Sequence, residues 1–393
     1  MTILQMHLTR DGTKNAIEAE DAGLGRILWV PVPVWQVNSW LPDLPVRMIQ
    51  MSIRTLRRRQ LDARRLYDGT PASFRSLWRH YKALLKFKRA VLSDSLADLI
   101  VPYHVDLLAM HWLSYDAESL IPSSLRARVP FVLINHFENA RLLLPEVREW
   151  ISRAAAVGTV SSQQIPRDLR RRCVNLSDAV DTEFFTPQKA RSLPPPARPF
   201  VLLPGRIQEG KGHYDLMQAA RIMLAKKIDL ALSFAGVVDS EPLIQELHRL
   251  SANMGLSRRI RFLGEISAEE LRDWYAASSI VVLPSYSEGL PRVLLEAQAM
   301  KKAVVAYNAG GIREAVLPGE TGYLVKAGNV EDLAEKVGFL LQNDAERQRM
   351  GERGREFVCR HFSVGSLIRR HEAFYLDVLS GARTWRSGAF TRQ

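Results

Sequence analysis

The stretch LPSYSEGLPRVLLEAQAM, residues 283–300, decides the fold class of this chain. It follows the apolar run 280–283, which is typical of a buried strand, and the part from Pro291 to Met300 has helical character. Proline suits the first turn of a helix because its missing N–H has no partner to lose there. A strand, a short loop and a helix in this order predict one unit of an α/β protein.

The same alternation extends along the chain in both directions. In the C-terminal half, strands are predicted at 200–203, 231–235, 260–263, 280–283 and 303–306, and helices at 214–226, 241–254, 268–277, 291–300 and 330–343. In the N-terminal half, strands are predicted at 3–8, 27–34, 99–101, 131–134 and 155–160, and a helix at 145–153. This pattern predicts two doubly wound, Rossmann-like domains with parallel sheets.

A proline-rich stretch separates the two halves. SLPPPARP, residues 192–199, is stiff and cannot continue a helix or a strand. We therefore expect an N-terminal domain at 1–190, a linker at 191–199 and a second domain at 200–365. The last segment, 366–393, is expected to form a helix and a tail that packs back on the N-terminal domain. Two such domains place a ligand in the cleft between them, at the carboxyl ends of the strands.

Composition excludes several classes of protein. The 393 residues are 47% hydrophobic and 24% charged, which is typical of a globular protein. The two cysteines lie in no CxxC pair, which excludes a disulfide scaffold and a cysteine zinc site and fits a reducing cytoplasm. The longest apolar run, 27–35, is far shorter than the ~20 residues that span a bilayer. No secretory signal is evident, so we expect a cytoplasmic protein, soluble or peripheral on the inner face of the membrane.

The positive charge is concentrated in one segment. The chain has a net charge of +12, and residues 47–90 alone hold thirteen Lys or Arg against two acids, a net +11. Residues 74–90 have helical period, with an apolar face and a basic face. Two interpretations stay open: a helix that binds an anionic membrane surface, or a helix that packs on its own domain and exposes its charges. No recognition motif supports nucleic-acid binding, which we do not expect.

The stretch LLPGRIQEGKG, residues 202–212, places two cations at a strand-to-helix turn. Arg206 and Lys211 lie five positions apart, close to the amides of the helix that follows. Cations and free helix amides suit a pyrophosphate, and glycines such as Gly205 let the backbone approach it. Taken alone, a plain loop with solvated charges explains these residues equally well.

The stretch 283–300 contains two carboxylates, Glu288 and Glu296. Glu288 follows a strand, and the amides of Gly289, Leu290 and Arg292 at the next helix start can hold a phosphate. Glu296 lies eight residues after Glu288, where a carboxylate can accept hydrogen bonds from a vicinal diol such as that of ribose. The alternatives are a helix-capping acid for Glu288 and a solvated helix face for Glu296, but the apolar neighbours of Glu296 indicate that it points into a cleft.

A third glycine-rich loop lies in AYNAGGIREAVLPGETGYLV, residues 306–325. Gly310 and Gly311 precede Glu314 after a predicted strand. A turn would explain this loop alone. Three such loops at the ends of successive strands of one domain favour a shared site instead.

Together, the Gly-Arg…Lys-Gly motif, the Glu288–Glu296 pair and the Gly310–Gly311 loop resemble the donor domain of family 4 retaining glycosyltransferases, which have the GT-B fold. The resemblance covers residues 178–345. It implies that Arg206 and Lys211 hold the diphosphate of a nucleotide sugar, that Glu288 faces the sugar and that Glu296 faces the ribose. It also implies that the backbone near Gly264 and Ile266 receives the base.

The N-terminal half resembles the family less. Family members have a Gly-Gly loop after the first strand, where this chain has TRDGTKNA with only Gly12. His136, in VLINHFENA, resembles the family's active-site histidine and is implied to be catalytic together with Glu288.

The resemblance implies a retaining hexosyltransferase that acts in polysaccharide biosynthesis. It would move a sugar from a nucleotide-diphosphate sugar to a hydroxyl of a glycan or lipid-linked acceptor, with the N-terminal domain on the acceptor side. No metal or other cofactor is expected, because the site motifs contain no DxD-like triplet and cations and helix amides can meet the diphosphate charge. The alternatives are a nucleotide-sugar epimerase or isomerase, and a non-catalytic nucleotide-sugar-binding protein.

Overall fold

The computed structural model describes residues 2–7, 18–22, 25–31, 106–111, 128–135, 145–162, 165–193 and 198–381. The chain divides into two compact units, residues 1–158 with 375–385 and residues 159–374 with 386–393. The division at 158/159 comes before 191–199, where the sequence predicts the linker. The linker role of that stretch stays a prediction.

The first sheet has the strand order β2-β3-β1-β4-β5-β6-β7. Its strands are β1 (Thr2–His7), β2 (Glu18–Ala22), β3 (Gly25–Pro31), β4 (Leu107–His111), β5 (Phe131–Asn135), β6 (Ala156–Thr159) and β7 (Cys173–Asn175). β1 pairs in parallel with β3 and β4, β4 pairs in parallel with β5, and β2 runs antiparallel to β3. Helix α5 (Pro145–Arg153) lies between β5 and β6 in the chain.

Four of the strands expected in the N-terminal half are confirmed, as β1, β3, β5 and β6, and the expected helix is α5. The strand expected at 99–101 lies outside the described residues. β2, β4 and β7 were not predicted. The short 3-10 helices Arg170–Arg172 and Pro187–Lys189 follow β6 and β7.

The second sheet is parallel throughout and has the order β10-β9-β8-β11-β12-β13. Its strands are β8 (Phe200–Pro204), β9 (Ala231–Ala235), β10 (Ile260–Gly264), β11 (Ile280–Leu283), β12 (Val304–Tyr307) and β13 (Gly322–Val325). The strand order runs one way from β8 to β10 and the other way from β11 to β13. β8 and β11 are therefore neighbours at a topological switch point, the place where open α/β sheets bind their ligands.

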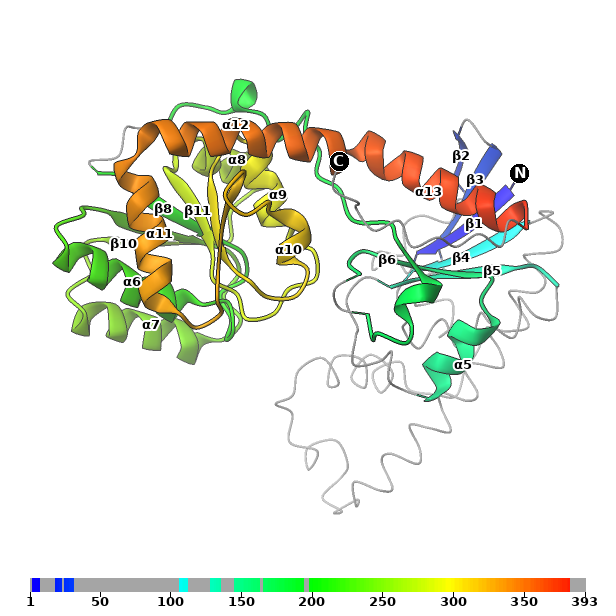
Figure 1. Ribbon diagram of the computed structural model, residues 1–393, viewed down its shortest axis with the longest axis horizontal. Helices are drawn as coiled ribbons and strands as arrows, with labels where there is room; N and C mark the ends of the chain where they lie inside the picture. The colour runs from blue at the N-terminus through cyan, green and yellow to red at the C-terminus, as the bar shows by residue number, and fades with distance from the viewer. Residues whose placement is uncertain are drawn as a thin grey trace, which may run out of the picture. The chain divides into compact units, whose positions relative to one another are not determined.

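Helices cover both faces of the second sheet (Figure 1). They are α6 (His213–Ala225), α7 (Glu241–Asn253), α8 (Ala268–Ala277), α9 (Arg292–Ala299), α10 (Ile312–Ala315), α11 (Val330–Gln342) and α12 (Asp344–His361). The chain then continues into α13 (Val364–Leu379). One apolar cluster joins a sheet face to α6, α7 and α11, and another joins the opposite face to α8, α9 and α10. Val201 belongs to the first cluster and its neighbour Leu202 to the second. A strand buried on both faces is apolar throughout, which is why these strands show as continuous apolar runs.

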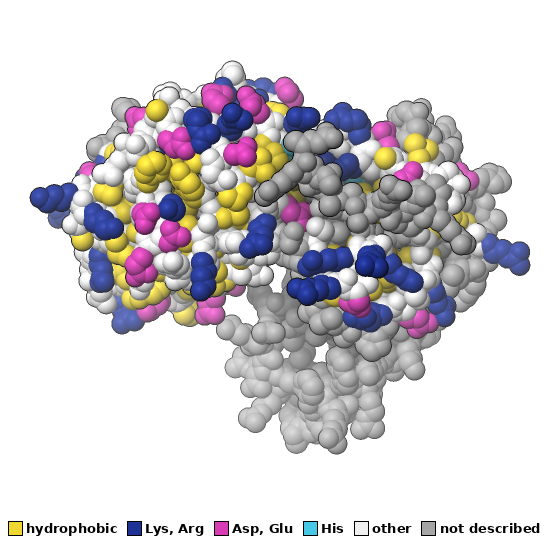
Figure 2. Space-filling model, viewed as in Figure 1, with side chains coloured by type: hydrophobic (Ala, Val, Ile, Leu, Met, Phe, Trp, Pro, Cys, Tyr) yellow, Lys and Arg dark blue, Asp and Glu magenta, His cyan; other side chains and the backbone are white. Residues whose placement is uncertain are grey.

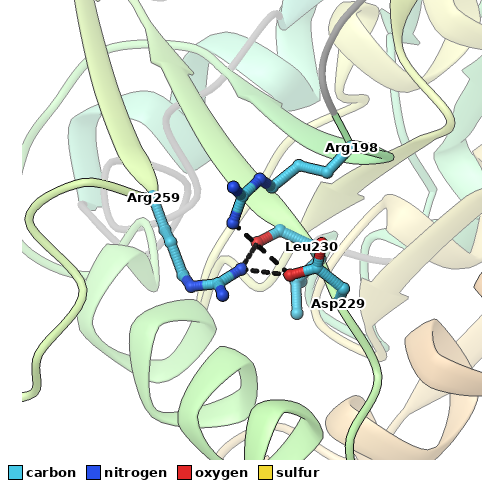
Figure 3. Close-up of polar contacts among 4 residues, drawn as sticks. All are labelled: Arg198, Asp229, Leu230 and Arg259. Carbon is cyan, nitrogen blue, oxygen red and sulfur yellow. Dashed lines mark hydrogen bonds and ion pairs between the residues drawn. The ribbon is translucent and has the colours of Figure 1, made fainter.

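We call the side of this sheet where its strands end the carboxyl edge, and the side where they begin the amino edge. The starts of β8, β9 and β10 lie at the amino edge (Figure 3). Asp229 accepts hydrogen bonds there from Arg259 and from Arg198 at 3.4 Å, and Arg259 also donates to the Leu230 carbonyl at 3.0 Å. A pocket of about 420 Å³ at this edge is lined by Arg198, Gly255, Ser257, Arg258 and Arg259.

Basic and acidic side chains are interspersed over the visible face of the second unit (Figure 2). The basic segment 47–90 lies outside the described residues, so its membrane role stays a prediction. Among the helices that the structure describes, none is long and apolar enough to cross a membrane.

Candidate functional site

The loops that leave β8 and β11 meet at the switch point of the second sheet. The Lys211 ammonium lies 2.5 Å from Glu288 Oε1, and the two side chains are 20% and 13% exposed. Lys211 comes from the loop before α6 and Glu288 from the loop before α9. The structure therefore joins two residues that the sequence places in separate motifs, and it does so where an α/β fold binds its ligand.

Close backbone approach holds these two loops together. Gly212, the residue before α6, has a φ of 74°, and a Cβ on it would lie 2.0 Å from the carbonyl oxygen of Pro284. In addition, the Tyr286 amide donates to the Gly210 carbonyl at 2.9 Å. Only glycine fits at position 212, because any side chain would push the two loops apart and separate the ion pair.

Arg206 lies at the same edge, directly after β8. Its side chain is exposed and, within the described part of the chain, forms no ion pair. The preceding Gly205 has a φ of 128°, and its carbonyl oxygen would lie 2.0 Å from a Cβ on Gly236, which follows β9. Two glycines thus bring the turns after β8 and β9 into contact and leave the guanidinium accessible.

The third glycine-rich loop packs directly on Glu288. The Gly311 amide donates to the Glu288 carbonyl at 3.1 Å, and a Cβ on Gly311 would lie 1.8 Å from the Gly289 carbonyl oxygen. The three loops that the sequence singles out therefore converge at one edge of the sheet.

Helix α9 begins at Arg292, one residue later than predicted, with Pro291 as its N-cap. Gly289 and Leu290 are buried and Arg292 is exposed. Their amides precede or open the first turn, where a helix has unsatisfied N–H groups and a partial positive charge. This is the local geometry that can hold a phosphate.

Glu296 is buried in the same helix and is only 8% exposed. The Tyr275 hydroxyl donates to its Oε2 at 3.0 Å. Burial raises the pKa of Glu296, whereas the Tyr275 hydrogen bond and the charge of Arg292 lower it and Asp178 raises it. The tyrosine partner was not predicted, and the expectation that Glu296 points into a cleft stays a prediction.

Gly264 and Ile266 lie at the carboxyl end of β10. Gly264 has a φ of 68°, which turns the chain sharply, and its carbonyl accepts from the Gly236 amide at 2.8 Å. This hydrogen bond joins the turn after β10 to the turn after β9. In the sheet, β9 is separated from β11 by β8. Ile266 is half-buried.

Asp215 is a site residue that sequence reasoning missed. It lies in the first turn of α6, is 9% exposed, and its Oδ2 accepts from the hydroxyls of Tyr286 and Tyr307, each at 2.6 Å. The hydrogen bond to Asp215 raises the pKa of Tyr286. Because Tyr286 is two residues before Glu288, this buried carboxylate ties the Glu288 loop to α6.

The partners of Glu314 were also missed. Its Oε1 accepts from Ser161 Oγ at 3.0 Å and from the amide and hydroxyl of Ser162 at 2.9 and 3.1 Å. Its Oε2 accepts from the Asn175 amide group at 2.7 Å. These four hydrogen bonds tie the Gly310–Gly311 loop to the segments that hold Ser161, Ser162 and Asn175.

His213 is a buried histidine beside Lys211. It is 4% exposed, and burial followed by the Lys211 charge lowers its pKa to about 4. It is therefore neutral at neutral pH and adds no charge to the loop.

His136 lies directly after β5 but outside the described residues, so its catalytic role stays a prediction. Within the described ranges, no group of three or more His, Cys, Asp or Glu side chains could hold a metal ion.

Sequence comparison matches residues 184–357 to the family model described as glycosyl transferases group 1. A D-inositol 3-phosphate glycosyltransferase of Corynebacterium aurimucosum is 32% identical over 220 residues, 53% of this chain and 52% of that protein. One from an Arthrobacter species is 35% identical over 175 residues, 44% of this chain and 41% of that protein. The chain thus spans about half the length of the curated relatives that it matches.

Solved structures share the fold over more of the chain. A sucrose-phosphate synthase from Thermosynechococcus elongatus has a TM-score of 0.66 at 20% identity and covers 96% of this chain and 89% of its own. A glycosyltransferase from Rickettsia africae has a TM-score of 0.65 at 23% identity, covering 75% and 83%. The Anabaena protein HepE, solved in complex with UDP, has a TM-score of 0.62 at 19% identity, covering 72% and 82%.

Proposed function

We propose that this chain, which has a GT-B fold and matches the glycosyl transferases group 1 family model over residues 184–357, is a retaining glycosyltransferase. It moves a sugar from a nucleotide-diphosphate sugar to a hydroxyl of a glycan or lipid-linked acceptor, in polysaccharide biosynthesis. The observation that supports this most is the Lys211–Glu288 pair at the switch point of the second sheet.

The donor diphosphate lies, in this proposal, between Arg206, Lys211 and the start of α9. An ammonium has three N–H donors, so Lys211 can bond Glu288 and still offer two to phosphate oxygens. The amides of Gly289, Leu290 and Arg292 add neutral donors at a positive helix end. The ribose lies against Glu296 and the base against the turn at Gly264 and Ile266.

The proposed reaction breaks the bond between the anomeric carbon and the diphosphate oxygen. A new bond forms between that carbon and the acceptor oxygen on the same face of the sugar, and the acceptor proton passes to the leaving diphosphate. Negative charge grows on the leaving group, where Arg206 and Lys211 stabilise the transition state more than the ground state. Two cations and the helix amides meet this charge, so we propose that no metal ion is required.

Names of relatives suggest which substrates to test first. UDP-sugars are the first donors to test, because HepE is solved with UDP. Phosphorylated polyols are the first acceptors to test, because the curated relatives are named for D-inositol 3-phosphate.

Product analysis by proton NMR tests the proposal. UDP-, GDP- and ADP-glucose are offered to the full chain with and without acceptor, in the presence of a chelator. A product with the donor's anomeric configuration, formed only when acceptor is present, is expected. An altered sugar formed without acceptor would identify an epimerase, and donor binding without turnover of any acceptor would favour a non-catalytic binding protein.

The basic segment 47–90 supports a second part of the proposal, peripheral attachment to an anionic membrane. Each cation near such a surface contributes about 1 kcal/mol, screened within a Debye length. Flotation with anionic vesicles at low salt tests it: the protein is expected to float, and to sink with neutral vesicles. Changing Arg75, Arg79, Lys82 and Lys86 together to Glu should abolish flotation. Protein left at the bottom with anionic vesicles would refute the attachment.

A further inference from the structure

Tyr275 is a fully buried tyrosine whose hydroxyl faces a carboxylate. It lies on α8 with 0% of its surface exposed, and its hydroxyl is 3.0 Å from Glu296 Oε2 and 3.2 Å from the Val293 carbonyl oxygen. A phenol has one proton to donate, and a charged acceptor competes for it better than a neutral carbonyl. Burial and the nearby Glu296 also raise the pKa of Tyr275 well above its usual value, so the phenol stays protonated and remains a donor.

The Tyr275 hydroxyl bonds one oxygen of the Glu296 carboxylate and not the other. Among the described residues, hydrogen bonds to the Glu296 side chain engage only Oε2. Burial raises the pKa of Glu296 and works against its ionised form. The groups around it are Tyr275 from α8, Arg292 from its own helix and Asp178 from the segment after β7. The first two favour the ionised form and Asp178 opposes it, so loss of the tyrosine hydroxyl removes the leading favourable contact.

Helix α8 holds Tyr275 firmly in place. The Phe185 ring packs edge-on against it with 6.0 Å between centroids. Immediately after Tyr275, the Lys302 ammonium donates to the carbonyls of Ala276 and Ser278 at 2.7 and 3.0 Å and so closes the C-terminal end of α8. A donor fixed in this way has little freedom to follow Glu296 if that side chain moves.

The same helix begins at the expected base-binding turn. Ser267 and Glu270 form a capping box at its N-terminus, directly after Gly264–Ile266. Helix α8 therefore connects the turn expected to receive the base with the carboxylate expected to face the ribose.

We propose that Tyr275 is a positioning residue for the nucleotide donor, because its hydroxyl fixes one oxygen of Glu296 and leaves the other directed to the vicinal diol of the ribose. This inference rests on the proposed function, in which Glu296 binds that diol. Tyr275 itself touches Glu296 and not the donor.

The test is a double-mutant cycle on nucleotide affinity. UDP, GDP and ADP are titrated calorimetrically into the full chain, and the one that binds most tightly is carried through Tyr275→Phe, Glu296→Gln and the double variant. Tyr275→Phe keeps the ring and its packing and removes only the hydroxyl. We expect it to weaken binding about tenfold, as for one hydrogen bond to a charged group. In the Glu296→Gln background the same change should have no further effect.

A pH series separates positioning from packing. In this proposal the ionised Glu296 carboxylate strengthens nucleotide binding, so affinity falls as pH drops through its pKa. Without the tyrosine hydroxyl that pKa rises further, and the fall should begin at a higher pH in Tyr275→Phe than in the wild type. Comparing the two proteins at each pH cancels the titration of the nucleotide itself. Tyr323→Phe is the matched control. Tyr323 lies on β13, the outermost strand of the sheet, and packs on Phe339.

Each other outcome is decisive. Wild-type affinity in Tyr275→Phe together with weakened binding in Glu296→Gln would overturn the inference and leave the proposed function standing. Equal losses from Tyr275→Phe in both backgrounds would show that the tyrosine acts by packing, which also overturns it. Wild-type affinity in Glu296→Gln would refute the ribose role on which the inference rests.

Discussion

The carboxyl edge and the amino edge of the second sheet each contain an ion pair, but the two pairs differ in their exposure to solvent. At the carboxyl edge, Lys211 and Glu288 form a pair that is 20% and 13% exposed. At the amino edge, Arg259 and Asp229 form a pair that is 29% and 56% exposed (Figure 3). A pocket at the amino edge is lined by Arg198, Arg258 and Arg259, so charge and cavity alone would favour it as an anion site.

Backbone polarity favours the other edge. In a parallel sheet covered by helices, the carboxyl edge lies beside helix N-termini and the amino edge beside helix C-termini. α6 ends at Ala225 before β9, and α7 ends at Asn253 before β10. Asp229 engages Arg198 and Arg259 there, and the Leu230 carbonyl also accepts from Arg259. The starts of α6 and α9 instead offer N–H groups and a partial positive charge to an anion. We therefore expect the phosphate site at the carboxyl edge and not among the arginines that Asp229 engages.

The largest expected effect concerns the carboxyl edge. Lys211→Ala removes a charge that interacts more strongly as the leaving diphosphate gains charge. Turnover with whichever donor and acceptor support transfer should fall ~10²-fold or more. Arg259→Ala at the amino edge is the matched control and should leave turnover within a few-fold of the wild type. Equal losses in both variants would remove the distinction between the edges.

The two carboxylates of the carboxyl edge should separate kinetically. Glu288→Gln should lower turnover more than donor affinity, because Glu288 faces the reacting sugar in our proposal. Glu296→Gln should instead weaken the free nucleoside diphosphate about tenfold, since a charged acceptor is exchanged for a neutral one. If nucleotide affinity falls with Glu288→Gln and not with Glu296→Gln, the two roles are reversed.

Asp215 should act through the loop that it holds. Asp215→Asn weakens the hydrogen bonds from Tyr286 and Tyr307, and we expect a loss of about 1–3 kcal/mol in the free energy of unfolding. The displaced Glu288 loop should also lower turnover about tenfold. Asp332→Asn, in the first turn of α11, is the control for removing an acid from a helix start. Turnover unchanged in Asp215→Asn would show that the loop keeps its position without this carboxylate.

The smallest expected effect concerns the amino edge. Arg259→Ala should change the free energy of unfolding by only about 0.2–1 kcal/mol, because the pair with Asp229 is exposed to solvent. The hydrogen bond from Arg259 holds the pKa of Asp229 below its usual value, so this contribution is present at neutral pH and disappears as pH falls through the lowered pKa. Urea unfolding at neutral and acidic pH measures it. If Arg259→Ala lost more free energy of unfolding at acidic pH than at neutral pH, the stabilisation could not come from the pair with ionised Asp229.

Much of the second unit could be predicted from the sequence because its strands are buried on both faces. β9, β11 and α8 have the predicted bounds. β13 was missed because it is short and its two middle residues are half-buried, which gives a weak apolar signal. α12 was missed because it is highly charged, with four buried residues in eighteen.

The sequence could predict which loops form the candidate site, but not which side chains contact one another within it. Local spacing places Arg206, Lys211 and Glu288 at strand ends, and parallel strand ends share one edge. It does not show that Tyr275 reaches Glu296, or that Glu314 binds Ser161. Those pairs depend on how α8 and α10 pack, which local patterns do not determine.

The most direct test of the account compares nucleotide binding between the two edges. UDP, GDP and ADP are titrated into the wild type, into Arg206→Ala/Lys211→Ala and into Arg198→Ala/Arg259→Ala, so that each double variant loses two positive charges. We predict that the carboxyl-edge variant binds the preferred nucleotide ~10²-fold more weakly, while the amino-edge variant stays within about twofold of the wild type. Weakened binding in the amino-edge variant with full affinity in the carboxyl-edge variant would contradict the account and place the anion site in the arginine-lined pocket.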